Sequence, residues 1–187
     1  MKTLIFDIDG TLTDLWPLER AILLMIIKKN LRQALDDARC LYGCDTYRLY
    51  RMGKKKPCLK IKYYELYDRA VRVIARRGHP SLAAYPLVAW IKKNRTRYHF
   101  VYATGGGRGE TLLVLRILGL SDIFDLSSSV DRNNCRFRKK TGMPYARIKR
   151  RFPDCVAVTD SKADVQGAQR AKIPFHLVSS RTKFLCV

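Results

Sequence analysis

Five short segments of apolar, β-branched or aromatic residues are spaced along the 187-residue chain, and helix-length stretches separate the later ones. The predicted strands are residues 3–6, 98–103, 123–127, 155–159 and 174–178. Helical patterns between the later strands cover residues 110–118, 144–151 and 161–171. Strands that alternate with helices are typical of a parallel sheet with helices on both faces. The sequence therefore predicts an α/β, doubly wound, Rossmann-like fold with five parallel strands.

The gap between the first two predicted strands is too long for a single crossover helix. It holds three helical patterns, over residues 17–29, 31–41 and 59–77. Pro17 suits the first turn of its helix, and glycines and prolines separate the patterns. We therefore expect residues 15–80 to form an inserted helical unit, and residues 1–14 and 81–187 to form the α/β core.

The chain is strongly basic, with 37 Lys and Arg against 16 Asp and Glu and a formal net charge of +21. Such a field attracts phosphorylated metabolites, nucleic acid and acidic lipids alike, so it describes partners only loosely. A solvated basic surface without a dedicated partner is the alternative interpretation.

No apolar run approaches the roughly 18 residues that a transmembrane helix requires. Met1 leads directly into the first predicted strand, without the pattern of a signal peptide. These features predict a cytoplasmic protein without a membrane span. The six cysteines show no paired C-x-x-C spacing, which favours reduced thiols, with a disulfide or a metal site as the alternatives. The oligomeric state is left open by the sequence.

Polar side chains follow the predicted strands where parallel sheets bind their ligands, at the carboxyl ends. Asp7 and Asp9 close the first strand, and Gly10 allows the backbone to turn away tightly. Two carboxylates this close repel each other unless they share a cation. Thr104 follows the second strand and leads into Gly105-Gly106-Gly107, whose amides could hold phosphate oxygens.

Further charged residues follow the later strands in the same way. Asp160 ends the fourth predicted strand, and Asp164 lies one helical turn beyond it. Lys139 and Lys140 stand between the third and fourth strands. Mg²⁺ accepts a few carboxylates, waters and a phosphate oxygen, while lysine and backbone amides neutralise the remaining phosphate charge. The set of residues therefore indicates phosphoryl transfer with Mg²⁺ as the cofactor.

Four motifs in this order resemble those of the haloacid dehalogenase superfamily, hydrolases that work through a phosphoaspartyl intermediate. They are FDIDGTLTD, VYATGG, the lysine near Lys140, and VTDSKADV. The resemblance implies a sheet of strand order 5-4-1-2-3. It also implies a helical cap inserted after the first motif, where residues 15–80 match in place and size.

The resemblance assigns the chemistry to the two aspartates of the first motif. It implies that Asp7 is the nucleophile and that Asp9 protonates the leaving oxygen and then activates water. Asp7, the backbone carbonyl of Asp9 and the carboxylate of Asp160 would hold Mg²⁺, with Asp164 acting directly or through water. The acid at Asp9 favours phosphate esters over carbon–halogen or phosphonate substrates, although a phosphomutase uses the same pair.

The remaining roles concern the substrate phosphate. The resemblance implies that Thr104 and the Gly105 amide bind phosphate oxygens and that Lys140 offsets charge between nucleophile and phosphate. Lys139 is nearly as plausible as Lys140, because KKTGMP replaces the usual lysine-proline signature. Thr159 stands where the family commonly has glycine before the aspartate, which bears on the local backbone geometry.

Two classes of function remain open. The first is a phosphatase for a small phosphorylated metabolite. The second is a nucleotide or polynucleotide end phosphatase, or a nucleic-acid-binding protein, that uses basic residues interleaved with tyrosines in 47–69 and the basic run 132–151. Arg108 resembles the arginine after the second motif in nucleotidases and polynucleotide phosphatases.

Overall fold

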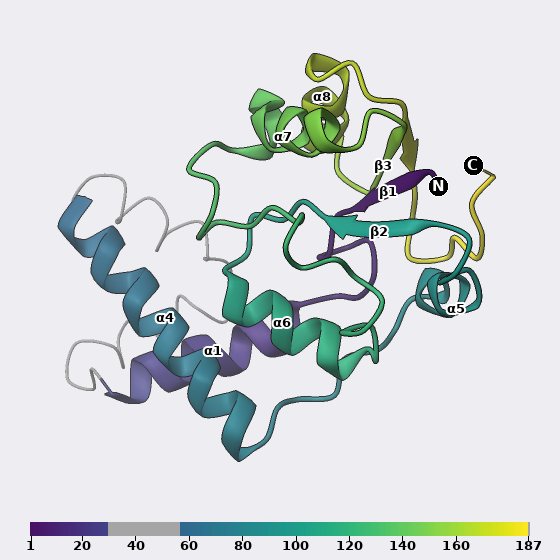
Figure 1. Cartoon of the computed structure of the whole chain (residues 1–187). Helices are drawn as coiled ribbons and strands as arrows, with labels where there is room; N and C mark the ends of the chain where they lie inside the picture. Colours follow the sequence, from purple (N-terminus) through teal and green to yellow (C-terminus); the bar gives the residue numbers. More distant parts are fainter. Residues whose placement is uncertain (30–56, 187) are drawn as a thin grey trace. The chain divides into compact units, whose positions relative to one another are not determined.

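The computed structural model describes residues 1–29 and 57–186. The chain divides into two compact units, Met1–Leu15 with Ser81–Val187, and Trp16–Pro80. Figure 1 follows the chain through both units. Each unit is described by itself below.

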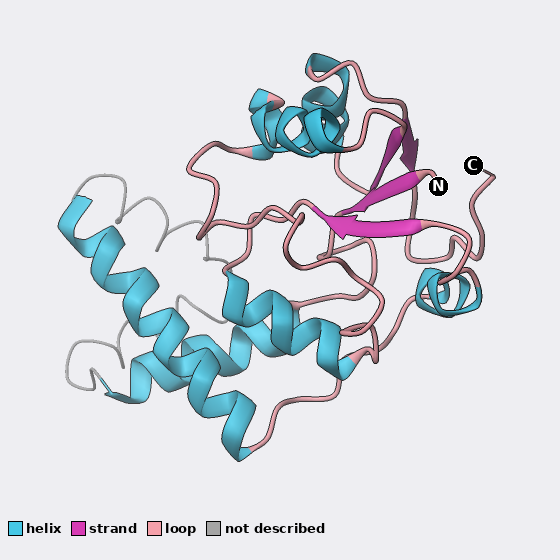
Figure 2. Ribbon diagram, in the orientation of Figure 1, coloured by secondary structure: helices cyan, strands magenta, loops and turns pink. Residues whose placement is uncertain are grey.

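The first unit is built on a four-stranded parallel sheet of order β2-β1-β3-β4, which Figure 2 shows as magenta arrows. The strands are β1 (Thr3–Phe6), β2 (His99–Tyr102), β3 (Cys155–Thr159) and β4 (Phe175–Leu177). Every residue of β1 and β3 is buried. Continuous apolar strands of this kind are typical of a parallel sheet with both faces covered.

Helices cover both faces of this sheet (Figure 1). They are α5 (Pro86–Lys93), α6 (Arg108–Ile117), α7 (Met143–Arg151) and α8 (Lys162–Arg170), with a 3₁₀ turn, η1, at Lys139–Thr141. On one face, Ile5 shares a buried cluster with Tyr145 of α7. On the other, Phe100 of β2 meets Trp90 of α5 edge to face, with ring centroids 6.5 Å apart. The predicted α/β fold with a parallel sheet is confirmed.

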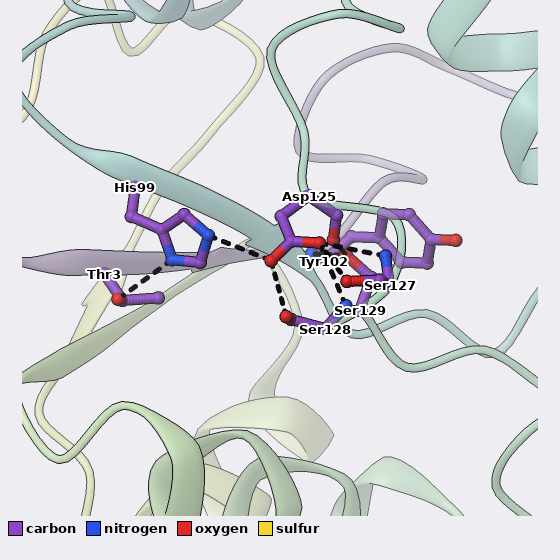
Figure 3. Close-up of polar contacts among 7 residues, drawn as sticks. All are labelled: Thr3, His99, Tyr102, Asp125, Ser127, Ser128 and Ser129. Atoms are coloured by element: carbon purple, nitrogen blue, oxygen red, sulfur yellow. Dashed lines mark hydrogen bonds and ion pairs between the residues drawn. The ribbon is translucent and has the colours of Figure 1, made fainter.

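The predicted third strand, residues 123–127, is wrong, and with it the predicted five-stranded sheet of order 5-4-1-2-3. Within this segment only Phe124 forms a bridge to β2, an isolated one with Phe100, and Val130 beyond it forms another with Ala103. The cause is a turn fixed by Asp125, whose Oδ1 accepts the backbone N–H groups of Ser127 at 2.9 Å and Ser128 at 3.1 Å (Figure 3). Side-chain acceptors of this kind compete with the hydrogen-bond ladder of a sheet.

The second unit contains α1 (Trp16–Lys29) and α4 (Pro57–Arg77), which contact each other. They correspond to the predicted helices 17–29 and 59–77. In α4, Tyr67, Val71 and Ile74 are buried and recur at the spacing of one helix face. The predicted helix 31–41 and residues 47–56 of the basic stretch lie outside the described residues.

Two further observations concern the whole described chain. None of its helices is long and apolar enough to cross a membrane. Cys135, Cys155 and Cys186 carry free thiols.

Candidate active site

The ends of three neighbouring strands bring the predicted site residues to one edge of the sheet. The register pairs Phe6 with Tyr102 on one side and with Val158 on the other. Asp7 follows directly and donates its backbone N–H to the carbonyl of Val158 at 2.9 Å. Thr104 and Asp160 each follow two residues beyond these partners. The strand order therefore places Asp7 between them.

Asp7, Lys139 and Asp164 form a charge triad in which both aspartates are buried and the lysine is partly buried. The Nζ of Lys139 lies 2.6 Å from Oδ1 of Asp7 and 2.5 Å from Oδ2 of Asp164. Asp7 also accepts the N–H of Ile8 on Oδ1 at 2.8 Å. One ammonium thus faces two carboxylates, so the triad carries a net negative charge when all three groups are ionised.

Burial controls the protonation of this triad. Loss of solvent, together with repulsion from Asp164, raises the pKa of Asp7 to about 7, while Lys139 partly offsets the rise. Burial alone would lower the pKa of Lys139, but the two carboxylates outweigh it and raise that pKa. Lys139 therefore stays protonated at neutral pH and favours the ionised form of Asp7.

Close packing of α8 against η1 sets the position of Lys139. A Cβ atom on Gly167 of α8 would overlap the backbone carbonyl of Lys139, so only glycine allows this approach. Thr159, at the end of β3, donates from Oγ1 to Oδ2 of Asp164 at 3.1 Å and accepts the N–H of Ser161 at 3.1 Å. The threonine that replaces the family's usual glycine thus helps to hold Asp164.

The structure does not bring Lys140 to the site. Lys140 is exposed, and its backbone carbonyl accepts a hydrogen bond from Arg170 at 3.0 Å. Lys139, the other lysine that the sequence allowed, is the one that contacts Asp7. Sequence spacing could not decide which of the two lysines contacts Asp7, because the direction of each side chain depends on the turn that η1 makes.

A tight loop after Asp7 links the first motif to Asp160. Gly10 has a φ of 74°, and a Cβ atom there would overlap the carboxylate of Asp160. Thr11 donates from Oγ1 to Oδ1 of Asp160 at 2.7 Å and accepts the Asp160 N–H at 3.1 Å. The sequence reasoning missed Thr11, although it stands inside the first motif. Thr11 therefore supports a predicted metal ligand.

Asp9 lies on the rim of the same loop. Its Oδ1 accepts the backbone N–H of Leu15 at 3.0 Å, which fixes the carboxylate although the residue is exposed. Desolvation by the surrounding protein raises the pKa of Asp9, and the charges of Asp14 and Asp160 add to this rise. A carboxyl group whose pKa lies above its ordinary value is suited to proton donation.

The loop after β2 offers polar groups to an anion. Thr104 is buried, and its Oγ1 accepts the N–H of Gly106 at 3.1 Å. The N–H of Gly107 is bound at 3.3 Å by Glu110, a buried residue of α6 that the sequence reasoning also missed. The sequence signal for Glu110 was its position three residues after Gly107, which is the spacing of a helix-capping pair. No neighbouring atom lies within 4 Å of the place where a Gly105 Cβ would stand. The loop is therefore open at Gly105.

The donor set fits Mg²⁺ in its chemistry. Across residues 1–29 and 57–186, no three His, Cys, Asp or Glu side chains are grouped closely enough to hold a metal ion by themselves. Mg²⁺ does not require such a cage, because it keeps several waters and takes one or two carboxylates plus substrate oxygens. Asp7 and Asp160 supply oxygen donors of this type at neighbouring strand ends.

A family model for haloacid dehalogenase-like hydrolases matches residues 1–172. A search of curated protein sequences found no significant match to the chain.

Several solved structures share the fold. A Thermotoga maritima protein assigned as a β-phosphoglucomutase is 24% identical with a TM-score of 0.60, covering 92% of this chain and 82% of that one. CbbY from Rhodobacter sphaeroides, in complex with phosphate, is 18% identical with a TM-score of 0.69, covering 94% and 84%. YfnB from Bacillus subtilis, a hydrolase of this type bound to magnesium, is 17% identical with a TM-score of 0.63, covering 98% and 95%. At these identities the similarity establishes the fold.

Proposed function

Because the chain belongs to the haloacid dehalogenase-like hydrolases, we propose that it hydrolyses phosphate monoesters of small metabolites through a phosphoaspartyl intermediate on Asp7. The observation that carries this proposal is the contact of 2.6 Å between Lys139 and the buried carboxylate of Asp7. The fixed ammonium favours the ionised form of the buried carboxyl group, which is the form that acts as a nucleophile.

In the first step, an oxygen of Asp7 forms a bond to phosphorus while the bond from phosphorus to the ester oxygen breaks. Asp9 gives its proton to the departing oxygen, which leaves as an alcohol. In the second step, Asp9 takes a proton from water, whose oxygen attacks phosphorus. The aspartyl–phosphate bond then breaks, which releases inorganic phosphate and regenerates Asp7.

Phosphate binding is assigned to the hydroxyl of Thr104, the amide of Gly105 and the ammonium of Lys139. The open loop at Gly105 supports this assignment, since a phosphate oxygen can approach the backbone there. Lys139 takes the role that the sequence first gave to Lys140, because it is the lysine that contacts Asp7.

Asp7, Asp160 and the backbone carbonyl of Asp9 would hold Mg²⁺. When bound, the ion would neutralise negative charge shared by the nucleophile and the phosphate. Asp164 is engaged by Lys139 and Thr159, so we assign it to positioning Lys139 and to the outer environment of the metal.

A small phosphorylated sugar is the favoured class of substrate. CbbY from Rhodobacter sphaeroides has been solved with xylulose-1,5-bisphosphate, and its structure matches this chain with a TM-score of 0.66. We assign the role of the cap to the helical unit, residues 15–80.

The test is hydrolysis of p-nitrophenyl phosphate and of a panel of sugar phosphates, with and without Mg²⁺. Asp7→Asn should abolish turnover, because an amide does not form the acyl phosphate. Asp154→Asn is the matched control, since Asp154 is an exposed aspartate whose side chain stands outside the proposed site. Equal turnover in both variants would contradict the proposal.

A further inference from the structure

A basic hollow lies between the loop that leads to η1 and the exposed face of α7. Its volume is about 480 Å³. The residues that line it are Arg132, Asn133, Asn134, Cys135, Arg136, Phe137, Met143, Arg147 and Arg150. The assigned catalytic residues are not among them, so the hollow is distinct from the site around Asp7.

The lining is strongly cationic. It contains four arginines and no acidic residue. Met143, Arg147 and Arg150 recur at positions i, i+4 and i+7 of α7, so they share one face of the helix. Guanidinium groups bind phosphate through paired hydrogen bonds. The hollow therefore favours a ligand that carries phosphate.

An aromatic ring stands at the same place. Phe137 is 43% exposed and Met143 is 42% exposed, so both present apolar surface to solvent within the hollow. The guanidinium of Arg136 lies 5.1 Å from the centroid of the Phe137 ring. An accessible ring beside arginines offers a stacking surface to a planar base, which a bare phosphate ion would not use.

Hydrogen bonds within the loop hold this hollow in shape. Asp131 is buried, and its Oδ1 accepts the N–H groups of Asn133 at 2.9 Å and Asn134 at 3.1 Å. The side-chain amide of Asn134 donates to the backbone carbonyl of Ser129 at 2.9 Å. The backbone carbonyl of Asn134 accepts a hydrogen bond from the guanidinium of Arg147 at 2.6 Å. A preformed site loses less entropy when a ligand binds.

The loop also touches the proposed phosphate-binding segment. Arg132 donates its backbone N–H to the carbonyl of Gly106 at 3.0 Å, and Asn133 accepts the N–H of Arg108 on its side chain at 2.7 Å. A ligand in the hollow would therefore contact a loop that is hydrogen-bonded to the segment after Thr104.

We propose that this hollow binds a nucleotide, with its phosphate on the arginines and its base stacked on Phe137. The proposal does not depend on phosphatase activity, because it concerns residues outside the Asp7 site. The same chemistry is presented by a free nucleotide and by a nucleotide within a single strand.

Binding is measured by fluorescence anisotropy with a labelled thymidine octanucleotide, and by calorimetry with AMP and with pyrophosphate. Arg150→Ala should weaken binding of AMP or of the octanucleotide about tenfold, as expected for loss of one charged hydrogen bond. Its control is Arg95→Ala, which removes another exposed arginine of the same unit. Phe137→Leu should weaken nucleotide binding about fivefold or more and leave pyrophosphate binding unchanged. Its control is Phe184→Leu, at a phenylalanine that is 66% exposed.

Competition separates the two sources of ligand. Displacement of the octanucleotide by AMP identifies a site for free nucleotides, whereas binding of the octanucleotide alone identifies a site for single strands, and both results support the proposal. Equal losses in Arg150→Ala and Arg95→Ala would show a diffuse charge effect and overturn it. Pyrophosphate binding as tight as AMP binding, an unchanged affinity in Phe137→Leu, or no binding of either nucleotide probe would also overturn it.

Discussion

The Nζ of Lys139 lies 2.6 Å from Oδ1 of Asp7, at the carboxyl end of the central strand β1. This contact joins a residue of the first sequence motif to one that follows it by more than a hundred positions. It gives the buried carboxylate a cation that does not depend on a bound metal. Catalysis by the proposed mechanism depends on this pair of residues.

Lys139→Met should lower kcat for p-nitrophenyl phosphate by about 10²- to 10³-fold, the usual cost of removing one charged group from a site of developing charge. Lys140→Met is the matched control and should retain activity within about twofold, because Lys140 is exposed and has no contact with Asp7. Steady-state kinetics on both variants decides the assignment. A larger fall in kcat for Lys140→Met than for Lys139→Met would show that Lys140 is the lysine that acts at the site.

Gly167→Ala should both destabilise the protein and lower kcat. The added methyl group overlaps the carbonyl of Lys139 and pushes η1 away from α8, with a cost of about 1–3 kcal/mol in the free energy of unfolding. Gln166→Ala, at an exposed position of the same helix, should change neither quantity noticeably. Urea unfolding and kinetics measure the two effects. Wild-type values in Gly167→Ala would show that the close approach of the helix is not needed.

Thr11→Val should raise the Mg²⁺ concentration needed for half-maximal activity by about 10- to 100-fold, as expected for loss of a residue that supports a metal ligand. Valine keeps the shape but loses the bond of 2.7 Å to Asp160. Thr96→Val, at an exposed threonine, is the control. EDTA should abolish the activity of the wild type and of both variants. Full hydrolysis in excess EDTA would refute the proposed metal site.

Asp125 should stabilise the fold in a pH-dependent way. Partial burial would raise its pKa, but hydrogen bonds from Ser128 and Ser127 outweigh it and hold the pKa of Asp125 well below its usual value of about 4. A lowered folded-state pKa means that the stabilisation is present above that usual value and is lost as the pH falls through the folded-state pKa.

Asp125→Asn should therefore lower the free energy of unfolding by about 1–3 kcal/mol at pH 7, and the difference from wild type should shrink as the pH falls below about 4. Asp122→Asn, at an exposed neighbour, should show no such difference. Urea unfolding at several pH values gives the comparison. A constant difference at every pH would mean that ionisation of Asp125 does not contribute.

The sequence predicted the parts of the fold that depend on runs of apolar residues. Every residue of Thr3–Phe6 and Cys155–Thr159 is buried. Short continuous apolar segments of this kind are typical of parallel strands that are covered on both faces. The strand predicted at residues 123–127 does not form, because the side chain of Asp125 accepts hydrogen bonds from the nearby backbone. The pattern of hydrophobic residues does not reveal this competition. The predicted order of five strands failed with that strand.

The candidate site followed the same division. Residues that directly follow a strand, such as Asp7 and Asp160, were placed by the strand itself. The choice between Lys139 and Lys140 depended on a short 3₁₀ turn and on the missing side chain of Gly167, which no spacing rule encodes. The basic hollow joins a loop to one face of α7, so its shape required the folded chain.

The proposed mechanism requires that Asp7 is phosphorylated during turnover. The most direct test is acid quenching of Asp9→Asn during reaction with p-nitrophenyl phosphate, followed by mass spectrometry of the peptide that contains Asp7. Nitrophenolate leaves without a proton, so the first step should proceed, while the second step lacks its base and the intermediate should accumulate. The account predicts one phosphoryl group on Asp7 in this variant and none when Asp7→Asn is added. Turnover without a phosphorylated peptide, or phosphorylation that persists after Asp7→Asn, would contradict it.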